Sequence, residues 1–412
     1  MPSDLPSARR LILWAAVVGL AARLAFGLLY WVDKPLTHDE REYLALSRSV
    51  AEGRGFTYQP DQGTGTTQRF GRAPLYPLFL ATIGSGSGDH AASPLRVKVA
   101  QSIVGAVGVW LIGLIALRTA GPLAGAAAAW IAAVYPPLVW ICAYVLSEAL
   151  YSTVALSAVL LLNRALDRAE PGRRAALALA AAAGCVTGLA ILVRPAMLFF
   201  LPLAGIWLTR KGRPMLAVLL IGVALATVAP WTIRNVRVHQ RFVLVASEGG
   251  VTFWTGNHPL ARGEGDLAAN PDIKRTEIAF RDARPGLTSE ELEPLYYRDA
   301  LEYIARHPLW WLGLLLRKAF YTVVPVGPSY TLHSTTYFVA SVAAYLLVLP
   351  FAVLGWWSRR RGRRPEALFV LAGSSVLAGL VFFPQERFRI PVIDPTLIVC
   401  AASAWPGRWK RS

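Results

Sequence analysis

The sequence predicts an all-α protein that crosses a membrane many times. Of the 412 residues, 55% are apolar and 16% are charged, and the mean hydropathy is +0.43. This balance is too apolar for an ordinary soluble domain. Apolar segments follow one another along the chain, and most of them are long enough to cross the hydrocarbon core of a bilayer. The three cysteines all lie in apolar runs, which argues against a disulfide framework.

The apolar segments predict about ten to twelve membrane helices. The first follows Arg9-Arg10 and is not followed by a small-residue cleavage site, so we expect a retained span rather than a removed signal peptide. The predicted spans are Leu11–Trp31, Val97–Leu117, Leu123–Ile141, Val145–Leu162, Ala175–Val193, Ala196–Leu208, Met215–Trp231, Tyr337–Trp357, Ala367–Phe383 and Ile390–Trp405. Between the first two, residues 40–51 place apolar side chains on one helical face and are expected to lie in the interface.

The placement of charge predicts the orientation. The net charge is +17, yet the two long polar loops, 31–95 and 232–307, each carry one more acidic than basic residue. Nearly all the basic excess lies in the two termini, the short loops and the Arg359–Arg364 run. These segments should therefore face the cytoplasm and the long loops the outside, as expected for the cytoplasmic membrane. This placement makes nucleic-acid binding an unnecessary explanation for the charge.

One apolar segment does not fit this alternation. If Leu309–Val326 crossed the membrane, the Arg359–Arg364 run would lie outside. The segment also carries Arg317-Lys318, so we expect it to lie in the outer interface or to form part of a re-entrant pair. The chain is thus divided into an N-terminal membrane module (1–231) whose first outer loop (32–95) carries the site, an extracytoplasmic loop (232–308) and a C-terminal membrane module (309–412).

Two adjacent carboxylates, Asp39 and Glu40, follow the first span and are candidate catalytic groups. Neighbours on a helix point about 100° apart, so the two rarely serve one substrate equally. Thr37 and Glu40 also have the spacing of a capping box, in which Glu40 would reach back to the start of the helix. Glu42 offers a second register with Asp39. The sequence leaves the catalytic and capping roles open.

A further carboxylate and several arginines are expected at the same outer level. Glu148 lies just inside a span, where an unpaired carboxylate costs roughly 2–3 kcal/mol, so it either forms a structural ion pair or lines an outward-facing site. The candidate phosphate-binding residues are Arg72, Arg194, Arg234, Glu386 and Arg387, the last two in the Gln385–Arg389 cluster. No metal-ligand set is predicted; the neighbouring carboxylates permit a divalent cation but do not require one.

A set of short motifs, in a fixed order and on fixed sides of the membrane, resembles a known family. The motifs are Asp39-Glu40, Arg72-Ala73-Pro74-Leu75-Tyr76-Pro77, Leu146-Ser147-Glu148-Ala149-Leu150, Val193-Arg194-Pro195, Trp231-Thr232-Ile233-Arg234-Asn235, Ser247-Glu248-Gly249-Gly250, Gly256-Asn257-His258-Pro259 and Glu386-Arg387-Phe388-Arg389-Ile390-Pro391. The chain resembles the C-type (GT-C) membrane glycosyltransferases, among them the bacterial relatives of protein O-mannosyltransferases and the lipid A aminoarabinose transferase. No single motif is specific; the order is.

The resemblance implies a GT-C fold and transfer of a sugar from a polyprenyl-phosphate carrier to an acceptor on the outer side of the membrane. The acceptor would be an envelope glycan, a lipid or a protein. In this family the acid of the first outer loop is the presumed base, which corresponds to Asp39, and a second acid in the next outer loop corresponds to Glu148. Relatives often have a double proline where this chain has Ala73-Pro74, which leaves the acceptor open.

The physical chemistry of such a transfer agrees with these residue types. A polyprenyl phosphate leaves as an anion and needs cations rather than an acid. The acceptor hydroxyl has a high pKa and needs a base, and a single displacement would invert the anomeric centre. We therefore expect Asp39 to be the base, Glu148 to orient acceptor or sugar, and Arg72 and Arg387 to contact the phosphate.

Two other functions remain open from the sequence. A transporter or flippase of a lipid-linked sugar would use a similar membrane scaffold, although inverted repeats and charges at the midplane, which that class favours, are not evident. A non-catalytic envelope scaffold would also tolerate large outer loops. The concentration of acids and arginines at one level favours the enzyme.

Overall fold

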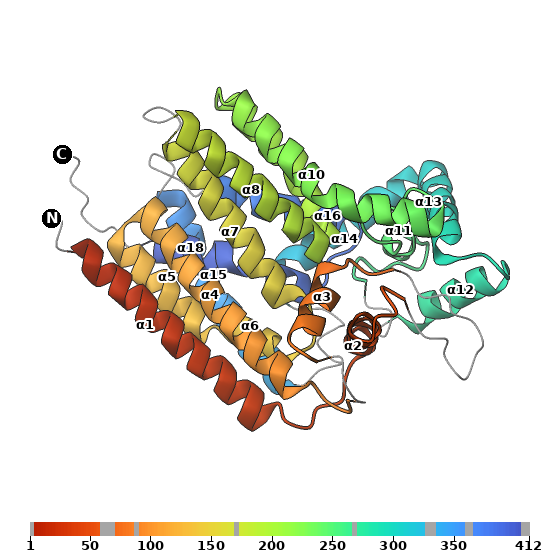
Figure 1. Ribbon diagram of the computed structural model, residues 1–412, viewed down its shortest axis with the longest axis horizontal. Coiled ribbons are helices and arrows are strands. Elements are labelled where there is room, and N and C mark those ends of the chain that lie inside the picture. Colours follow the sequence, from red (N-terminus) through yellow and green to blue (C-terminus); the bar gives the residue numbers. More distant parts are fainter. Residues whose placement is uncertain are drawn as a thin grey trace.

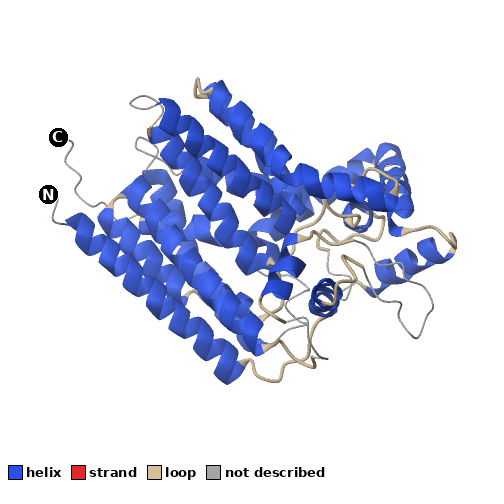
Figure 2. Ribbon diagram, in the orientation of Figure 1, coloured by secondary structure: helices blue, strands red, loops and turns tan. Residues whose placement is uncertain are grey.

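The structure is a computed structural model that describes residues 4–57, 71–85, 90–168, 173–265, 270–325, 335–358 and 366–404. Figure 2 shows that these residues form helices joined by loops. Within them there is no β-strand, only an isolated bridge between Pro35 and Ala92. The predicted all-α fold is confirmed. The Arg359–Arg364 run lies outside the described residues.

Most helices form one long bundle (Figure 1). Its members are α1 (Asp4–Ala25) with the π-helix η1 (Phe26–Tyr30), α4 (Leu95–Ala120), α5 (Pro122–Val134), α6 (Pro136–Trp140) with η2 (Ile141–Ala143), α7 (Glu148–Asp167), α8 (Arg173–Val193), η3 (Pro195–Phe199) with α9 (Phe200–Arg210), α10 (Pro214–His239), α15 (Thr335–Ser358), α16 (Glu366–Val381) and α18 (Ile393–Ala402). The outer helices are α2 (His38–Ala51), α3 (Leu75–Thr82), α11 (Gly249–Asn257), α12 (Pro271–Asp282), α13 (Ser289–Arg306), α14 (Pro308–Val323) and α17 (Glu386–Arg389).

The ten predicted spans correspond to helices of the bundle. Within the described residues, six helices are long and apolar enough to cross a membrane, and a seventh candidate is the pair α5–α6, bent by 62° at Tyr135-Pro136. The bend follows from proline, which lacks the amide proton that would continue the helix. Three shorter apolar helices account for the rest. The chain is an integral membrane protein, and α14 is not among its candidate spans.

Packing of the bundle is that of a membrane protein. One large core of small and aliphatic side chains joins the faces that the helices turn toward one another. On the opposite faces large apolar side chains such as Trp14 and Leu347 are exposed. In water such a surface would be unfavourable, whereas in a bilayer it meets lipid. Arg23, in the last turn of α1, is buried and donates to the carbonyl oxygens of Ala132 and Ala133, so it faces the bundle.

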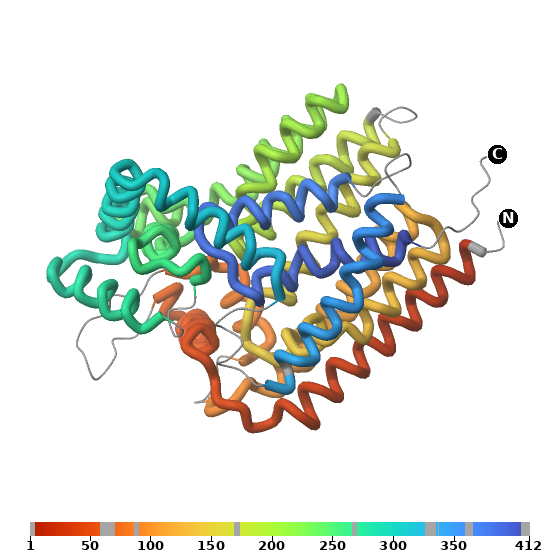
Figure 3. Tube along the Cα trace, turned by 180° about the vertical axis from the view of Figure 1, so that it is seen from behind, coloured from red at the N-terminus to blue at the C-terminus, as the bar shows by residue number. Residues whose placement is uncertain are grey.

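The two ends of the bundle differ in content. The start of α1 and the end of α18 lie at one end, and α2, α3 and α11–α13 gather at the other (Figures 1 and 3). At the first end Lys211 pairs with Glu366, which joins two segments that the charge pattern assigned to the same side. The predicted segregation of the two long loops to one end therefore agrees with the structure.

The outer helices have a small core of their own, built on Trp254, Leu292 and Tyr296. Helix α11 lies against α13 because Gly250 allows it: a Cβ atom there would meet the backbone of Glu293. Helix α14 joins this unit to the bundle, since the buried Nζ of Lys318 donates to Asn257 Oδ1 (3.0 Å) and to the carbonyl oxygen of Leu380 (3.1 Å). The outer unit is thereby fixed over the end of the bundle.

Candidate active site

A cavity of about 1990 Å³ opens between the bundle and the outer helices. Sites for one small molecule usually measure about 300–1000 Å³, so this one has room for two substrates. Its wall is drawn from α2, α7, α11, α12, α13, α16 and α17, that is, from the beginning, middle and end of the chain. Segments that are far apart in the sequence therefore meet at this cavity.

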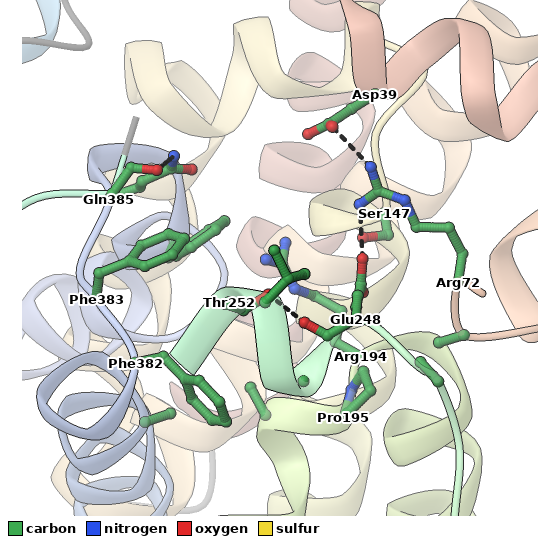
Figure 4. Close-up of a pocket in the computed structure, with 18 of the residues that line it drawn as sticks. Asp39, Arg72, Ser147, Arg194, Pro195, Glu248, Thr252, Phe382, Phe383 and Gln385 are labelled. Atoms are coloured by element: carbon green, nitrogen blue, oxygen red, sulfur yellow. Dashed lines mark hydrogen bonds and ion pairs between the residues drawn. The ribbon is translucent and has the colours of Figure 1, made fainter. Parts of the chain in front are cut away.

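The wall of the cavity changes character along its length. Toward the bundle it is formed by apolar side chains, among them Pro195, Phe199, Pro202 and Phe382. Figure 4 shows Pro195 and Phe382 below a group of charged side chains that includes Asp39. An amphiphilic ligand with an apolar tail and a charged head would match this division.

Asp39 lies between two arginines. Its Oδ1 accepts a hydrogen bond from Arg72 Nη2 (2.8 Å), and its Oδ2 accepts one from Arg387 Nη2 (2.6 Å). Burial alone would raise the pKa of Asp39, but the guanidinium groups of Arg387 and Arg72 outweigh burial and hold that pKa well below its usual range. Asp39 is thus ionised at any ordinary pH, and a carboxylate so stabilised is a weak base.

Arg72 is held by three carboxylates rather than left free for a ligand. Besides Asp39 it contacts Glu42, through Nε at 2.9 Å and through Nη2, and Glu248, through Nη1 at 3.2 Å. The preceding residue, Gly71, exchanges hydrogen bonds with Ser247 (2.8 and 3.1 Å), which places Arg72 beside Glu248. Arg72 therefore joins the first outer loop to the start of α11. A phosphate that bound Arg72, as the sequence predicted, would have to compete with three carboxylates for its guanidinium.

Glu148 and two arginines form the inner part of the site. Arg194 Nη1 lies 2.7 Å from Glu148 Oε1, and Arg387 Nε lies 3.8 Å from the same oxygen. Arg194 also stacks over the ring of Phe388, with its Cζ 4.6 Å from the centroid. Both arginines line the cavity where its apolar wall ends. Asp39 and Glu148 are therefore connected through the guanidinium of Arg387.

Glu40 has the capping role that the sequence left open. Its Oε2 accepts from the backbone nitrogen (2.8 Å) and hydroxyl (2.9 Å) of Thr37, and its Oε1 accepts from the backbone nitrogen of Val145 (2.8 Å). It is not among the residues that line the cavity. Glu42, which shares a helix face with Asp39 through the i,i+3 spacing, lines the cavity where Glu40 does not.

Two further predicted phosphate residues lie apart from this network. Arg234, near the end of α10, stacks on Trp231 and donates to Asn235, and it does not line the cavity. Glu386 lines the cavity, but its charged neighbours are Arg389, Asp394 and Glu264. Burial is the main cause that raises the pKa of Glu386 to about 9, so this side chain is a neutral acid at pH 7.

The sequence analysis did not select Glu248. It precedes the Gly249-Gly250 pair in the larger outer loop, and it lines the cavity opposite Asp39, with Arg72 between them (Figure 4). Its only signal in the sequence was its place in a motif of the resemblance. The pairing between Gly71 and Ser247 that brings Glu248 to the site joins positions 176 residues apart, and no local pattern predicts such a contact.

A divalent cation fits the carboxylates poorly. His38, Asp39 and Glu42 each offer one ligand atom, all within 4.8 Å of one another. Asp39 and Glu42, however, are already paired with Arg72, and Asp39 also with Arg387. A cation would have to displace a guanidinium from these oxygens, at the cost of two favourable ion pairs. We assign no metal ligands in this site.

Comparison with solved structures identifies the fold. The oligosaccharyltransferase of Archaeoglobus fulgidus, in complex with Zn and sulfate, superposes with a TM-score of 0.57 at 14% sequence identity, over 96% of this chain and 48% of that one. The same enzyme, AglB, in complex with an inhibitory peptide and a dolichol-phosphate gives 0.54 at 15% identity, over 95% and 50%. This chain thus spans about half the length of that enzyme.

A lower similarity links the chain to ArnT from Cupriavidus metallidurans bound to undecaprenyl phosphate, with a TM-score of 0.43 at 15% identity over 92% of this chain and 77% of that one. The sequence matches no family model and no curated protein. At these sequence identities the superposition on the archaeal enzyme shows similarity of fold only. The chain has the fold of the C-type membrane glycosyltransferases.

Proposed function

We propose that the protein transfers a glycosyl group from a polyprenyl-phosphate donor to an acceptor at the outer face of the cytoplasmic membrane. The observation that carries this proposal is the position of Arg194 and Arg387. Both lie at the junction between the apolar wall of the cavity and its carboxylates. A polyprenyl phosphate has the same order of parts, an apolar chain, then an anionic phosphate, then a polar sugar.

The two arginines suit the leaving group. Departure of polyprenyl phosphate leaves negative charge on its oxygens. Fixed guanidinium groups stabilise that charge, so the leaving phosphate does not need to be protonated. Arg194 and Arg387 are held in place by Glu148, whose carboxylate is buried between them. Glu148 thus acts through the arginines and positions them, a role different from the orientation of acceptor or sugar expected from the sequence.

The reaction is a single displacement at the anomeric carbon. The bond between C1 and the phosphate oxygen breaks, a bond between C1 and an acceptor oxygen forms, and the configuration at C1 inverts. The acceptor loses a proton to a carboxylate of the cavity wall. The archaeal enzyme of the same fold forms a complex with a dolichol-phosphate, which supports a lipid phosphate as the ligand of this cavity.

The test is the release of free polyprenyl phosphate. Purified protein in nanodiscs is incubated with a panel of short-chain polyprenyl-phosphate hexoses and pentoses, radiolabelled in the sugar, together with an envelope fraction as acceptor. An enzyme transfers label to the acceptor and liberates polyprenyl phosphate. A transporter in sealed vesicles moves intact donor across the bilayer, and a scaffold does neither.

Two arginine variants make this test specific. Arg387→Gln removes one of the two arginines proposed to hold the phosphate and should lower release about 100-fold. Arg234→Gln is the matched control, because Arg234 has the same chemistry at the same end of the molecule but does not line the cavity. If wild-type protein releases no polyprenyl phosphate from any donor of the panel, or if both variants behave alike, the proposed function is wrong.

A further inference from the structure

The ion pairs of Asp39 raise the question of which carboxylate takes the acceptor's proton. Both oxygens of Asp39 are engaged, one by Arg72 and the other by Arg387. To act as the base, Asp39 would have to leave at least one of these arginines during the reaction. A different carboxylate that faces the cavity with fewer partners would be a better acceptor of the proton.

We propose that Glu248 is the group that accepts the proton of the acceptor hydroxyl, while Asp39 holds Arg72 and Arg387 in position. This inference rests on the proposed glycosyl transfer and adds the identity of its base. It makes Glu248 a catalytic residue and assigns Asp39 a positioning role.

Accessibility favours Glu248 among the four carboxylates that pair with Arg72, Arg194 or Arg387. The exposed fraction of its side chain is 30%, compared with 24% for Asp39, 11% for Glu42 and 2% for Glu148. Its contact with Arg72, at 3.2 Å, is also longer than the 2.8 Å contact of Asp39 with the same arginine. Glu248 is therefore the carboxylate that an incoming hydroxyl reaches at the lowest cost.

The location of Glu248 separates the two substrates. It lies at the start of α11, where the cavity continues between the outer helices past Thr252, Glu293 and Tyr297. The phosphate-binding pair, Arg194 and Arg387, lies on the side of the bundle. An acceptor that enters between the outer helices would thus lie beside Glu248.

The electrostatic surroundings favour proton uptake by Glu248. Burial is the main cause that raises its pKa; Asp39 and Glu42 on α2 raise it further, while Arg72 and Arg194 lower it. From α13 the carboxylate of Glu293 faces it as well. The pKa of Glu248 is thus raised where that of Asp39 is lowered, and a base is more effective when its pKa lies closer to the working pH.

The proposed step is balanced. The acceptor O–H proton moves to a carboxylate oxygen of Glu248 as the acceptor oxygen bonds to C1. The electron pair of the C1–O bond leaves with polyprenyl phosphate, whose charge stays with Arg194 and Arg387. Glu248 then returns its proton to water when the product departs. No oxidant, reductant or metal is needed.

The test compares Glu248→Gln with Glu302→Gln. The second variant removes one acid from the same outer unit at an exposed position of α13. We expect Glu248→Gln to lower turnover about 100- to 1000-fold, as removal of a general base does. It should bind decaprenyl phosphate at least as tightly as wild type, which also shows that the variant is folded, while Glu302→Gln should match wild type in both measurements.

Two further readouts separate a base from a structural group. Turnover of Glu248→Ala should be partly restored by added formate, which can enter the space left by the side chain. The acid limb of the pH–rate profile should lie above the ordinary pKa of glutamate, because below its raised pKa Glu248 is protonated and cannot accept a proton.

The outcomes are distinguishable. If wild-type protein transfers sugar and Glu248→Gln retains more than a tenth of its turnover, or if formate does not rescue Glu248→Ala, the assignment of Glu248 is overturned and the proposed function stands. If Asp39→Ala alone, with intact phosphate binding, is rescued by formate, Asp39 is the base. Failure of wild-type protein to release polyprenyl phosphate would overturn the function itself.

Discussion

Arg387 and Arg389 lie two residues apart on the short helix α17, and each pairs with an aspartate, yet they differ in what surrounds them. Arg387 faces the cavity and shares the carboxylates of Asp39 and Glu148. Arg389 also borders the cavity, but it is almost fully buried: it pairs with Asp394 at 2.8 Å and stacks on Tyr345, and the exposed fractions of Arg389 and Asp394 are 4% and 0%.

The difference teaches what an ion pair at this level can do. A buried pair with fixed neighbours can only hold helices together, and its loss leaves a charge in an apolar core. A pair at a cavity wall can exchange its partner for a charged ligand, because solvent and substrate reach it. We therefore expect the ion pair of Arg389 to stabilise the fold and the ion pairs of Arg387 to serve ligand binding. The variants below test this difference.

The largest expected effect is on stability. Asp394→Asn leaves the guanidinium of Arg389 buried without a counter-charge, and we expect a loss of about 3–5 kcal/mol in the free energy of unfolding. Thermal unfolding in detergent, followed by intrinsic fluorescence, measures this loss. The double variant Arg389→Met with Asp394→Leu should recover most of it, since no charge remains buried. An unchanged melting temperature in Asp394→Asn would remove the distinction between the two arginines.

The next effect is on catalysis. Arg194→Gln and Arg387→Gln should each lower the release of polyprenyl phosphate about 100-fold, equivalent to roughly 2.7 kcal/mol of transition-state stabilisation. Their melting temperatures should stay near that of wild type, because both side chains line the cavity rather than the packed core of the bundle. Arg387→Lys keeps the charge but loses the fork that reaches Asp39 and Glu148 together, so its activity should be intermediate.

These two residues also show how far the sequence leads. Composition and periodicity predict the spans, because the bilayer imposes the length and polarity of each helix. The motif Glu386-Arg387-Phe388-Arg389 predicts an arginine at the outer end of the last span, but not which of the two arginines pairs with the carboxylates of Asp39 and Glu148. Only the tertiary packing of α17 on Asp394 and Tyr345 decides this.

Other parts of the site follow the same rule. The Thr37–Glu40 capping box is local, so the sequence contained both its residues and its role. Arg234 was placed with the phosphate residues because it ends a span at the correct level, yet α10 turns it away from the cavity. Glu248 was missed because its contact with Arg72 depends on two outer loops that meet only in the folded chain.

A smaller effect is expected at Glu148, which is buried like the ion pair of Arg389 but contacts the arginines of the cavity, Arg194 and Arg387. Glu148→Gln keeps the shape and loses the charge, so the arginines should remain near their positions but be held less firmly. We expect about a 10-fold loss of turnover, mainly through a higher KM for the donor. A loss as large as that of Glu248→Gln would indicate direct contact with the reacting atoms.

The smallest effect concerns Glu386, which adjoins Arg387 in sequence but has the buried pair Arg389 and Asp394 as charged neighbours. Burial raises its pKa to about 9 in the folded protein, whereas in the unfolded chain it ionises near 4.5. Between these values the folded state binds a proton that the unfolded state has released, so the stability contributed by this group falls as pH rises through that window. Glu386→Gln cannot ionise and should remove this loss. Its melting temperature should match that of wild type near pH 5 and exceed it increasingly up to about pH 9. A constant difference across this range would mean that Glu386 is already ionised at neutral pH.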